Sequence, residues 1–208
     1  MLKLAVMISG GGTNLQALID EINSGALQDV SIEIVISTRS DAYALERAKK
    51  HDIPGVSIVK KDYSDQRAYE DALLEMIDSY NVDLLVLAGC LAIIPPKVVR
   101  KYKNRIINIH PSLIPAFSGP GYYGLKVHEA ALARGVKVTG ATVHFVDEGT
   151  DTGPIILQKP VEVLDGDNAE SLQKRVMEEA EWKLLAEAVR LIAQNRLVIE
   201  GSRVKIKE

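Results

Sequence analysis

Two polar side chains with catalytic potential stand two residues apart in Asn108-Ile109-His110-Pro111-Ser112, at the end of an apolar run that begins near Arg105. In a β-strand this spacing places the amide of Asn108 and the imidazole of His110 on one face. Such a pair can donate hydrogen bonds to an oxyanion or transfer a proton at a shared target. The ordinary alternatives are an Asn that caps a turn and a His that is simply hydrogen-bonded at a strand end.

A second group of polar residues lies in the segment HFVDEGTDTGP, where Asp151 follows His144 by seven residues within a predicted turn. A carboxylate on a loop can approach a reaction site, and the Thr152-Gly153-Pro154 sequence that follows constrains this one. Asp147 and Glu148 share the loop and are expected to be solvated turn residues. Taken singly, each of these acids is more often structural than catalytic.

Three consecutive glycines form the core of the segment SGGGTNLQ, which runs from Ser9 to Gln16 between a predicted strand and a predicted helix. Unpaired backbone N–H groups and the helix dipole favour an anion at such a place. Gly10 and Gly12 fit the start of the dinucleotide fingerprint, but Leu15 occupies its third glycine position, so a single phosphate is favoured over a pyrophosphate. The alternative is a tight turn that needs glycine for its geometry alone.

The chain has four histidines and one cysteine, with no H-x-x-x-H or C-x-x-C spacing, so no metal site is predicted. His51 and His128 fall in helical patterns and are expected on the surface. Cys90 follows an apolar strand and is interpreted as a small core residue. A single cysteine excludes an intrachain disulfide framework and is typical of a reducing cytoplasm.

The elements that must position these residues are predicted from hydrophobic periodicity. Short apolar runs alternate with helical patterns over the first half, which is typical of βα units that build a parallel sheet. Five runs are predicted as buried parallel strands: 3–8, 31–37, 55–58, 83–88 and 105–110. Four helical patterns separate them and are expected to cover both faces of the sheet: 14–24, 42–51, 64–80 and a short helix that starts near Pro95.

The second half of the chain has a different pattern. A loop rich in proline, glycine and aromatic residues follows Pro111, and two alternating runs further on are expected to pair as a hairpin around EGTDTG. The predicted elements are a helix over 125–134, strands over 138–147 and 154–164, a long helix over 168–195 capped by Asn168 or Ser171, and a small hairpin over 197–199 and 203–206. The fold class is therefore α/β, with an open, mostly parallel Rossmann-like sheet, helices on both faces, an antiparallel C-terminal portion and a long C-terminal helix.

Composition sets the scale of the molecule and excludes several functional classes. With 208 residues, 47% of them hydrophobic, a single domain over 1–208 is expected, made of a βα half over 1–110 and a second half over 111–208. The net charge of −3 is not concentrated, which argues against nucleic-acid and membrane partners. The longest uncharged apolar run, between Leu84 and Pro96, is too short for a membrane span. The N-terminal strand leads into the glycine loop rather than into a secretion signal, so a cytoplasmic location is expected.

Four segments, SGGGTNLQ, LVLAG, NIHPSLIPAFSG and VHFVDEGTDTGPIILQ, resemble the glycinamide ribonucleotide formyltransferase family over nearly the whole chain. The resemblance implies a folate-dependent enzyme of de novo purine synthesis. Such an enzyme transfers the formyl group of 10-formyltetrahydrofolate to the amine of glycinamide ribonucleotide through a tetrahedral intermediate. No metal and no covalent intermediate are implied, and the partners are these two small molecules. The first half of the chain would bind the nucleotide, the second would complete the folate site, and the enzyme would be a monomer or a homodimer.

The resemblance also implies roles for particular residues. The catalytic trio would be Asn108, His110 and Asp151. The first two would donate to the oxyanion, and the third would orient His110 or a water and keep the imidazole protonated or relay protons from the attacking amine to the leaving nitrogen. The nucleotide would be held by Gly11, Gly12, Thr13, Asn14 and Glu181, and the folate by Leu91, Ala92, Ile93, Ile94, Asp147, Gly149 and Asp151.

The resemblance includes one backbone feature and two departures from the family pattern. The Ile114–Pro115 bond would be cis. Ala92 stands where some members of the family have Arg, which leaves folate contacts to backbone groups. Trp182 follows Glu181 where the family has a Glu-His pair, so Glu179 is the alternative nucleotide ligand.

Several other functions share parts of this pattern. Methionyl-tRNA formyltransferase, formyltetrahydrofolate deformylase and sugar formyltransferases use the same trio with other acceptors. The first needs an additional basic domain and the second an N-terminal regulatory module, whereas this sequence begins at its first strand. A non-catalytic nucleotide-binding module would explain the glycine loop but not Asn108 and Asp151. A dehydrogenase would need a complete glycine fingerprint and an acidic residue where Thr38-Arg39 ends the second strand.

Overall fold

The computed structural model describes residues 1–207 of the chain, which divides into two compact units, Met1–Ile107 and Asn108–Glu208. Each unit is described by itself, and the single-domain organisation stays a prediction. Among the described residues, no helix combines the length and the apolar character that a membrane crossing requires.

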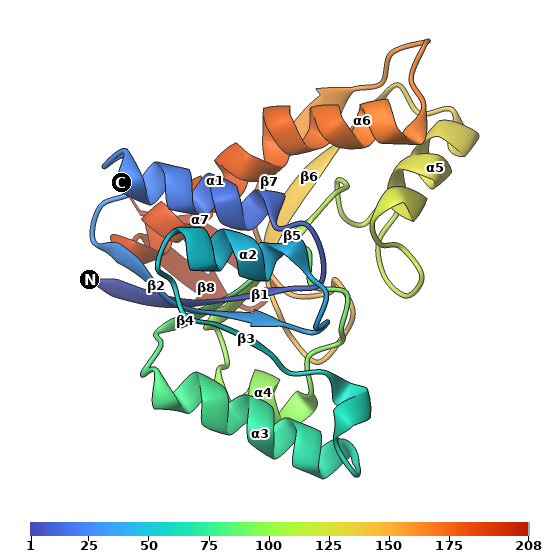
Figure 1. The fold of residues 1–208 in the computed structure, drawn as a ribbon. Coiled ribbons are helices and arrows are strands. Elements are labelled where there is room, and N and C mark those ends of the chain that lie inside the picture. Colours follow the sequence, from blue (N-terminus) through green and yellow to red (C-terminus); the bar gives the residue numbers. More distant parts are fainter. Residues whose placement is uncertain (208) are drawn as a thin grey trace. The chain divides into compact units, whose positions relative to one another are not determined.

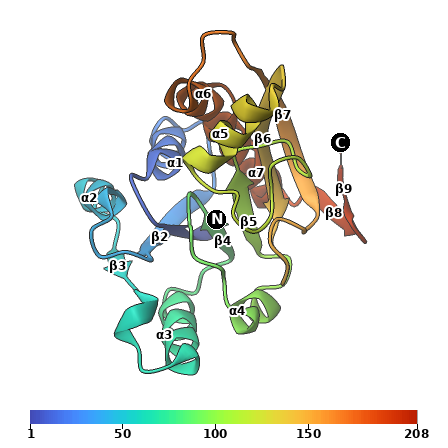
Figure 2. The same ribbon diagram turned by 90° about the vertical axis from the view of Figure 1, so that its right-hand side faces the viewer.

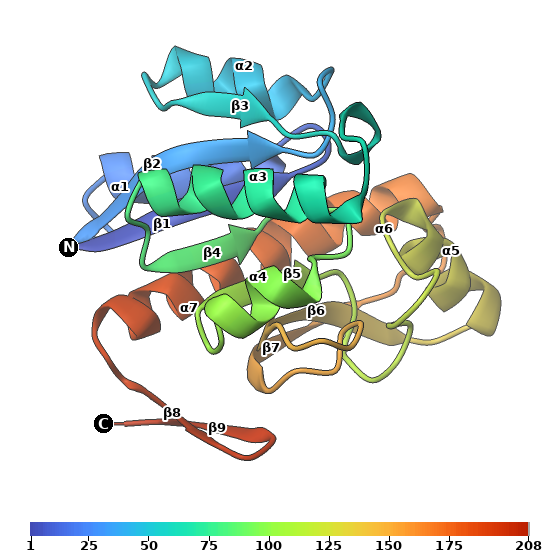
Figure 3. The same ribbon diagram turned by 90° about the horizontal axis from the view of Figure 1, so that it is seen from below.

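The first unit is a parallel βα arrangement (Figure 1). Its sheet has the order β3-β2-β1-β4, with parallel pairing between neighbours. The helices α1 and α2 lie on one face of this sheet, and α3 and α4 lie on the other (Figure 3), as predicted. The elements are β1 (Leu2–Ile8), α1 (Thr13–Asn23), β2 (Val30–Ser37), α2 (Tyr43–Lys50), β3 (Gly55–Ser57), a 3-10 turn (Lys60–Asp62), α3 (Gln66–Ser79), β4 (Leu84–Leu87) and α4 (Pro96–Lys101).

Strand β1 explains why the first unit forms a parallel sheet. Every residue from Leu4 to Ile8 is fully buried, so the strand is apolar without alternation. A strand needs this composition when helices cover both faces of its sheet. Helix α3 begins at a side-chain cap, since the Asp65 carboxylate accepts a hydrogen bond from the Ala68 N–H at 2.8 Å. The predicted strands and helices of this half are confirmed, with ends that differ by at most two residues; the 3-10 turn was not predicted.

Strand β5 (Ile106–His110) spans the boundary between the units, and the second unit continues through an antiparallel arrangement. Strands β6 (Val138–Phe145) and β7 (Ile155–Glu162) pair antiparallel along their length (Figure 2), which confirms the predicted hairpin. The small C-terminal hairpin is also present. The remaining elements are α5 (Leu125–Arg134), α6 (Ala169–Val176), a π turn (Met177–Glu181), α7 (Trp182–Ala193), β8 (Leu197–Glu200) and β9 (Arg203–Ile206).

The long C-terminal helix has an internal irregularity. Its start is a capping box in which Asn168 Oδ1 accepts from the Ser171 N–H at 2.8 Å and Ser171 Oγ accepts from the Asn168 N–H at 3.0 Å. The predicted apolar row recurs every four residues, which exceeds the 3.6 residues of an α-helical turn and makes the row drift around the axis. The π turn between α6 and α7 is wider and takes up part of that drift. Glu181, the last residue of the π turn, is buried.

His128 is not on the surface, and that prediction is wrong. In α5 it shares the buried stripe with Val127 and Ala131, and its side chain is fully buried. Neither ring nitrogen has a hydrogen-bond partner in the structure, and burial lowers the pKa of His128 to about 4. A helical pattern marks a stripe of apolar positions, and a polar residue inside the stripe is buried with it. His51 is exposed, as predicted.

Candidate active site

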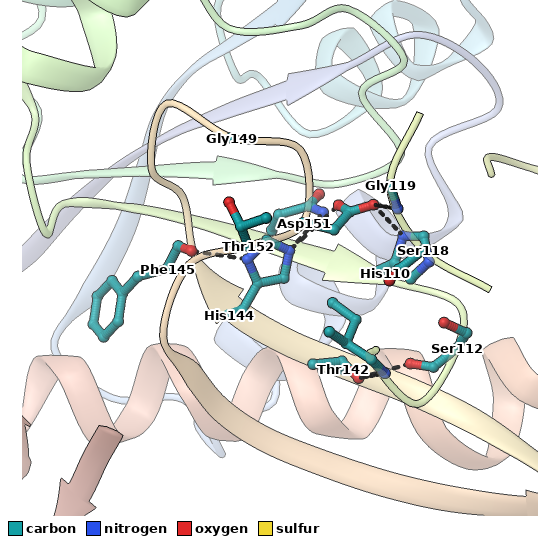
Figure 4. A network of polar contacts seen from close by, with 12 residues as sticks. His110, Ser112, Ser118, Gly119, Thr142, His144, Phe145, Gly149, Asp151 and Thr152 are labelled. Atoms are coloured by element: carbon teal, nitrogen blue, oxygen red, sulfur yellow. Dashed lines mark hydrogen bonds and ion pairs between the residues drawn. The ribbon is translucent and has the colours of Figure 1, made fainter. Parts of the chain in front are cut away.

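The second unit places the rings of His110 and His144 on either side of the Asp151 carboxylate (Figure 4). Asp151 lies between two imidazoles, with Oδ2 3.5 Å from His110 Nδ1 and Oδ1 3.6 Å from His144 Nε2. Asn108 Nδ2 lies 3.2 Å from His144 Nε2. Asn108 and His110 come from β5, His144 comes from β6, and Asp151 comes from the loop after β6. The four groups therefore form a continuous polar chain.

His144 is the member that sequence reasoning left outside the proposed catalytic set. The sequence relates His144 to Asp151 only by a separation of seven residues. The bond to Asn108 depends on how β5 and β6 lie, which periodicity does not give. The usable signal was that His144 stands directly before the loop that carries Asp151.

Backbone carbonyl groups decide where the imidazole protons reside. Phe117 O lies 2.9 Å from His110 Nε2, and Phe145 O lies 2.8 Å from His144 Nδ1. A carbonyl oxygen can only accept, so each of these nitrogens carries a proton and donates. In the neutral rings, the lone pairs are then on His110 Nδ1, facing Asp151, and on His144 Nε2, which accepts from the Asn108 amide.

Burial and charge set the protonation of the pair. Burial lowers the pKa of His110, an effect that the Asp151 carboxylate partly offsets. Burial alone would raise the pKa of Asp151, but the His144 ring, the charge interaction with His110 and the Gly119 N–H at 2.9 Å outweigh it and lower that pKa. At neutral pH, His110 is therefore neutral and Asp151 is ionised. A proton that reaches His110 Nδ1 is stabilised by the carboxylate beside it.

The loop that presents Asp151 is fixed by contacts of its own. Asp147 Oδ1 accepts from the Gly149 N–H at 3.0 Å and from Thr152 Oγ1 at 2.6 Å. Asp151 adopts a left-handed backbone conformation with φ of 57°, which is uncommon outside glycine and tolerated by Asp. A Cβ atom at Gly153 would overlap the Phe145 carbonyl group, so only glycine fits there. These constraints fix the direction in which the carboxylate points.

The loop after β5 positions the Phe117 carbonyl that holds His110. Ser112 Oγ donates to Ala116 O at 2.6 Å, and Thr142 Oγ1 on β6 donates to Ser112 O at 2.6 Å. Phe117 itself has a φ of 50°, a left-handed conformation that costs free energy and is found mainly at functional sites. The Ile114–Pro115 peptide bond is cis, as the resemblance predicted.

The glycine loop belongs to the first unit. Gly12 has a φ of 73°, and a Cβ there would lie 2.6 Å from Ala44 Cβ, so this glycine is required by geometry. A Cβ at Gly10 or Gly11 would meet no atom within 4 Å. The need for a tight turn therefore explains Gly12 but not its two neighbours, which leave open backbone for a ligand.

The remaining predicted binding residues lie in both units. In the segment after β4, the Leu91 side chain is 56% exposed and that of Ile93 is 81% exposed, whereas Ile94 is buried. Of the nucleotide residues, Thr13 is partly buried and Asn14 is buried at the start of α1, and Glu181 is buried in the π turn. Within the described part of the chain, no three His, Cys, Asp or Glu side chains gather as a possible metal site.

Comparisons with known proteins agree with this geometry. The formyl transferase family model matches residues 2–189. The phosphoribosylglycinamide formyltransferase of Haemophilus influenzae is 39% identical over 202 residues, which cover 97% of this chain and 92% of that protein. The chain therefore belongs to the formyl transferase family.

Several relatives within the family carry the glycinamide ribonucleotide name. The glycinamide ribonucleotide transformylase 1 structure from Symbiobacterium toebii has a TM-score of 0.93 and 45% identity, covering 100% of this chain and 95% of that one. The chloroplastic phosphoribosylglycinamide formyltransferase of Vigna unguiculata is 38% identical over 94% of this chain, which spans only 62% of that protein. A formyltetrahydrofolate deformylase from Pseudomonas syringae has a TM-score of 0.88 at 29% identity, and this chain spans 66% of it.

Proposed function

We propose that this protein transfers the formyl group of 10-formyltetrahydrofolate to the amine of glycinamide ribonucleotide, a step of purine synthesis. The observation that carries the proposal is the ionised Asp151 carboxylate between His110 and His144, with Asn108 bonded to the second ring. The higher identity of the chain to proteins named for this ribonucleotide than to the deformylase favours this acceptor.

The polar chain supplies what the reaction needs. The neutral amine attacks the formyl carbon, and a tetrahedral oxyanion forms. One N–H of the Asn108 amide is taken by His144, which leaves the second for this oxyanion. The new C–N bond remains when the bond to N10 of the folate breaks, and the proton lost by the amine is returned to N10.

His110 has a more specific role than oxyanion donation. Its Nε2 proton is held by Phe117 O, so the neutral ring has no free donor, and its available atom is the Nδ1 lone pair. We assign this atom as the acceptor of the amine proton, with Asp151 stabilising the imidazolium until the proton moves to N10. By stabilising the imidazolium, Asp151 allows His110 to take up the amine proton and to release it again at neutral pH.

The binding residues follow from the same proposal. The open backbone of Gly11, together with Gly12, Thr13 and Asn14 at the start of α1, would hold the phosphate, and Glu181 would bind another part of the nucleotide. The folate would contact the segment Leu91, Ala92, Ile93 and Ile94, in which Leu91 and Ile93 are exposed, and the loop residues Asp147, Gly149 and Asp151. We further propose a cytoplasmic enzyme that needs no metal and works as a monomer or a homodimer.

A spectrophotometric assay with 10-formyl-dideazafolate tests the proposal. The absorbance change that accompanies formyl loss should require glycinamide ribonucleotide. A change of the same rate without the nucleotide would identify a hydrolytic deformylase instead. No change under either condition would refute formyl transfer from this donor. That result would instead favour a non-catalytic nucleotide-binding module.

A further inference from the structure

The Ser9 hydroxyl forms a buried junction at the end of β1. Ser9 is only 4% exposed, and its Oγ accepts a hydrogen bond from the Leu91 N–H at 2.7 Å. The same oxygen lies 2.6 Å from Thr38 Oγ1, just beyond β2. Three chain segments of the first unit therefore meet at one hydroxyl group.

The hydrogen bonds at this junction run in one direction. Because Leu91 donates to Ser9 Oγ, the Ser9 proton is free to go to Thr38 Oγ1, and Thr38 Oγ1 lies 3.4 Å from the Ile8 carbonyl, which can accept its proton. The Ser9 N–H also donates to Gly89 O at 3.1 Å. Two bonds from Ser9 thus hold the segment that exposes the apolar side chains of Leu91 and Ile93.

The glycine loop is held from a different side. Arg47 on α2 donates from Nε to Gly11 O at 2.8 Å and from Nη1 to Gln16 Oε1 at 3.1 Å. The Ala44 N–H donates to Gly10 O at 3.2 Å. The Arg47 guanidinium also lies 5.2 Å from the centre of the Tyr43 ring. These contacts tie the loop to α2 without the Ser9 hydroxyl.

We propose that Ser9 and Arg47 are separate positioning residues for the two substrates. Ser9 orders the segment 89–94 for the flat ring of the formyl folate, and Arg47 orders the glycine loop for the phosphate of the nucleotide. The inference rests on the proposed function, because it takes these two segments as the binding places of the two substrates.

The expected effects come from the free-energy cost of ordering each segment for substrate binding. Without the hydroxyl, the Leu91 N–H loses its acceptor and the segment populates conformations that do not bind. Apparent affinity falls in proportion to the binding-competent fraction. Ser9→Ala should therefore raise the KM of the formyl folate by roughly tenfold and change the KM of the nucleotide by less than about twofold. Arg47→Met should show the reverse, with a similar rise in the KM of the nucleotide alone.

Steady-state kinetics in both substrates, with the wild type and five variants, tests the proposal. Ser24→Ala and Arg67→Met are matched controls, because both side chains are exposed in the same unit, Ser24 directly after α1 and Arg67 on α3. Arg47→Lys keeps the charge but cannot reach both acceptors in a fork, so it should recover only part of the nucleotide affinity. Equal changes of both KM values in either variant would overturn the separation of the two roles.

Amide hydrogen exchange gives a readout that needs no turnover. In Ser9→Ala, the Leu91 amide should exchange faster while the Ala44 amide, which donates to Gly10 O, keeps its rate, and in Arg47→Met the pattern should be inverted. If the wild type transfers no formyl group but exchange changes as expected, the proposed function fails and the two anchors stand. If transfer occurs and Ser9→Ala leaves both the exchange of Leu91 and the folate KM unchanged, the anchor proposal is wrong.

Discussion

Replacing Asp151 by Asn removes one negative charge and little else. The side chains have the same size, and an amide oxygen can still accept from the Gly119 N–H that Asp151 Oδ2 binds at 2.9 Å. The loop geometry is fixed by Asp147 and Gly153 rather than by the charge. We therefore expect the variant to fold normally, with a midpoint of thermal unfolding within a few degrees of the wild type.

The effect on catalysis follows from distance. The carboxylate oxygen lies 3.5 Å from His110 Nδ1, the atom assigned to receive the proton. At that separation, an effective dielectric constant near 20 gives an attraction of about 5 kcal/mol as an upper bound for the imidazolium. Because solvation compensates part of the lost attraction, we expect kcat to fall by about 10³-fold, which corresponds to about 4 kcal/mol in activation free energy.

The dependence of kcat/KM on pH checks the assignment independently. His110 must be neutral to accept a proton, so activity is lost as pH falls through its pKa. In the wild type, Asp151 partly offsets the lowering of that pKa by burial. Asp151→Asn removes the offset, so the acid limb should move to lower pH while the plateau drops. A kcat within fivefold of wild type, or an acid limb that moves to higher pH, would refute the relay through His110.

Three further predictions concern other parts of the second unit. Asn108→Ala should lower kcat by about 10²–10³-fold with little change in the KM of either substrate, because it removes an oxyanion donor; a change confined to KM would contradict that role. Gly153→Ala should displace the Asp151 loop, since its Cβ overlaps the Phe145 carbonyl group, and lower kcat by at least ~100-fold, whereas a crystal structure with an unmoved loop would contradict the steric argument. His128 titrates near 6.5 when unfolded and at about 4 when folded, so the unfolded state binds more protons between these values and stability falls as pH falls from 6.5 to 4. His128→Leu should abolish this part of the pH dependence, about 3 kcal/mol, in urea denaturation from pH 7 to 4; an unchanged slope would show that His128 does not titrate with unfolding.

The sequence by itself determined the elements and their faces. Uninterrupted apolar runs identified β1 and β4, because a strand covered on both sides has no exposed face to keep polar. Alternation around EGTDTG gave the β6–β7 hairpin. The two-residue spacing of Asn108 and His110 predicted that the two side chains share one face of a strand. In the structure, Asn108 contacts His144 and His110 contacts Asp151, so both belong to the same polar chain. These are local properties, fixed by the period of the backbone.

The tertiary structure decided which groups meet and which protons are free. His144 joins the polar chain of Asn108, Asp151 and His110 because β6 brings its Nε2 to the Asn108 amide. The Phe117 carbonyl takes the Nε2 proton of His110 and leaves Nδ1 as the reactive atom. His128 is buried because its helix turns that stripe inward, and Glu181 is buried at the end of the π turn. Partner, tautomer and burial depend on residues distant in the chain, so only the folded structure specifies them.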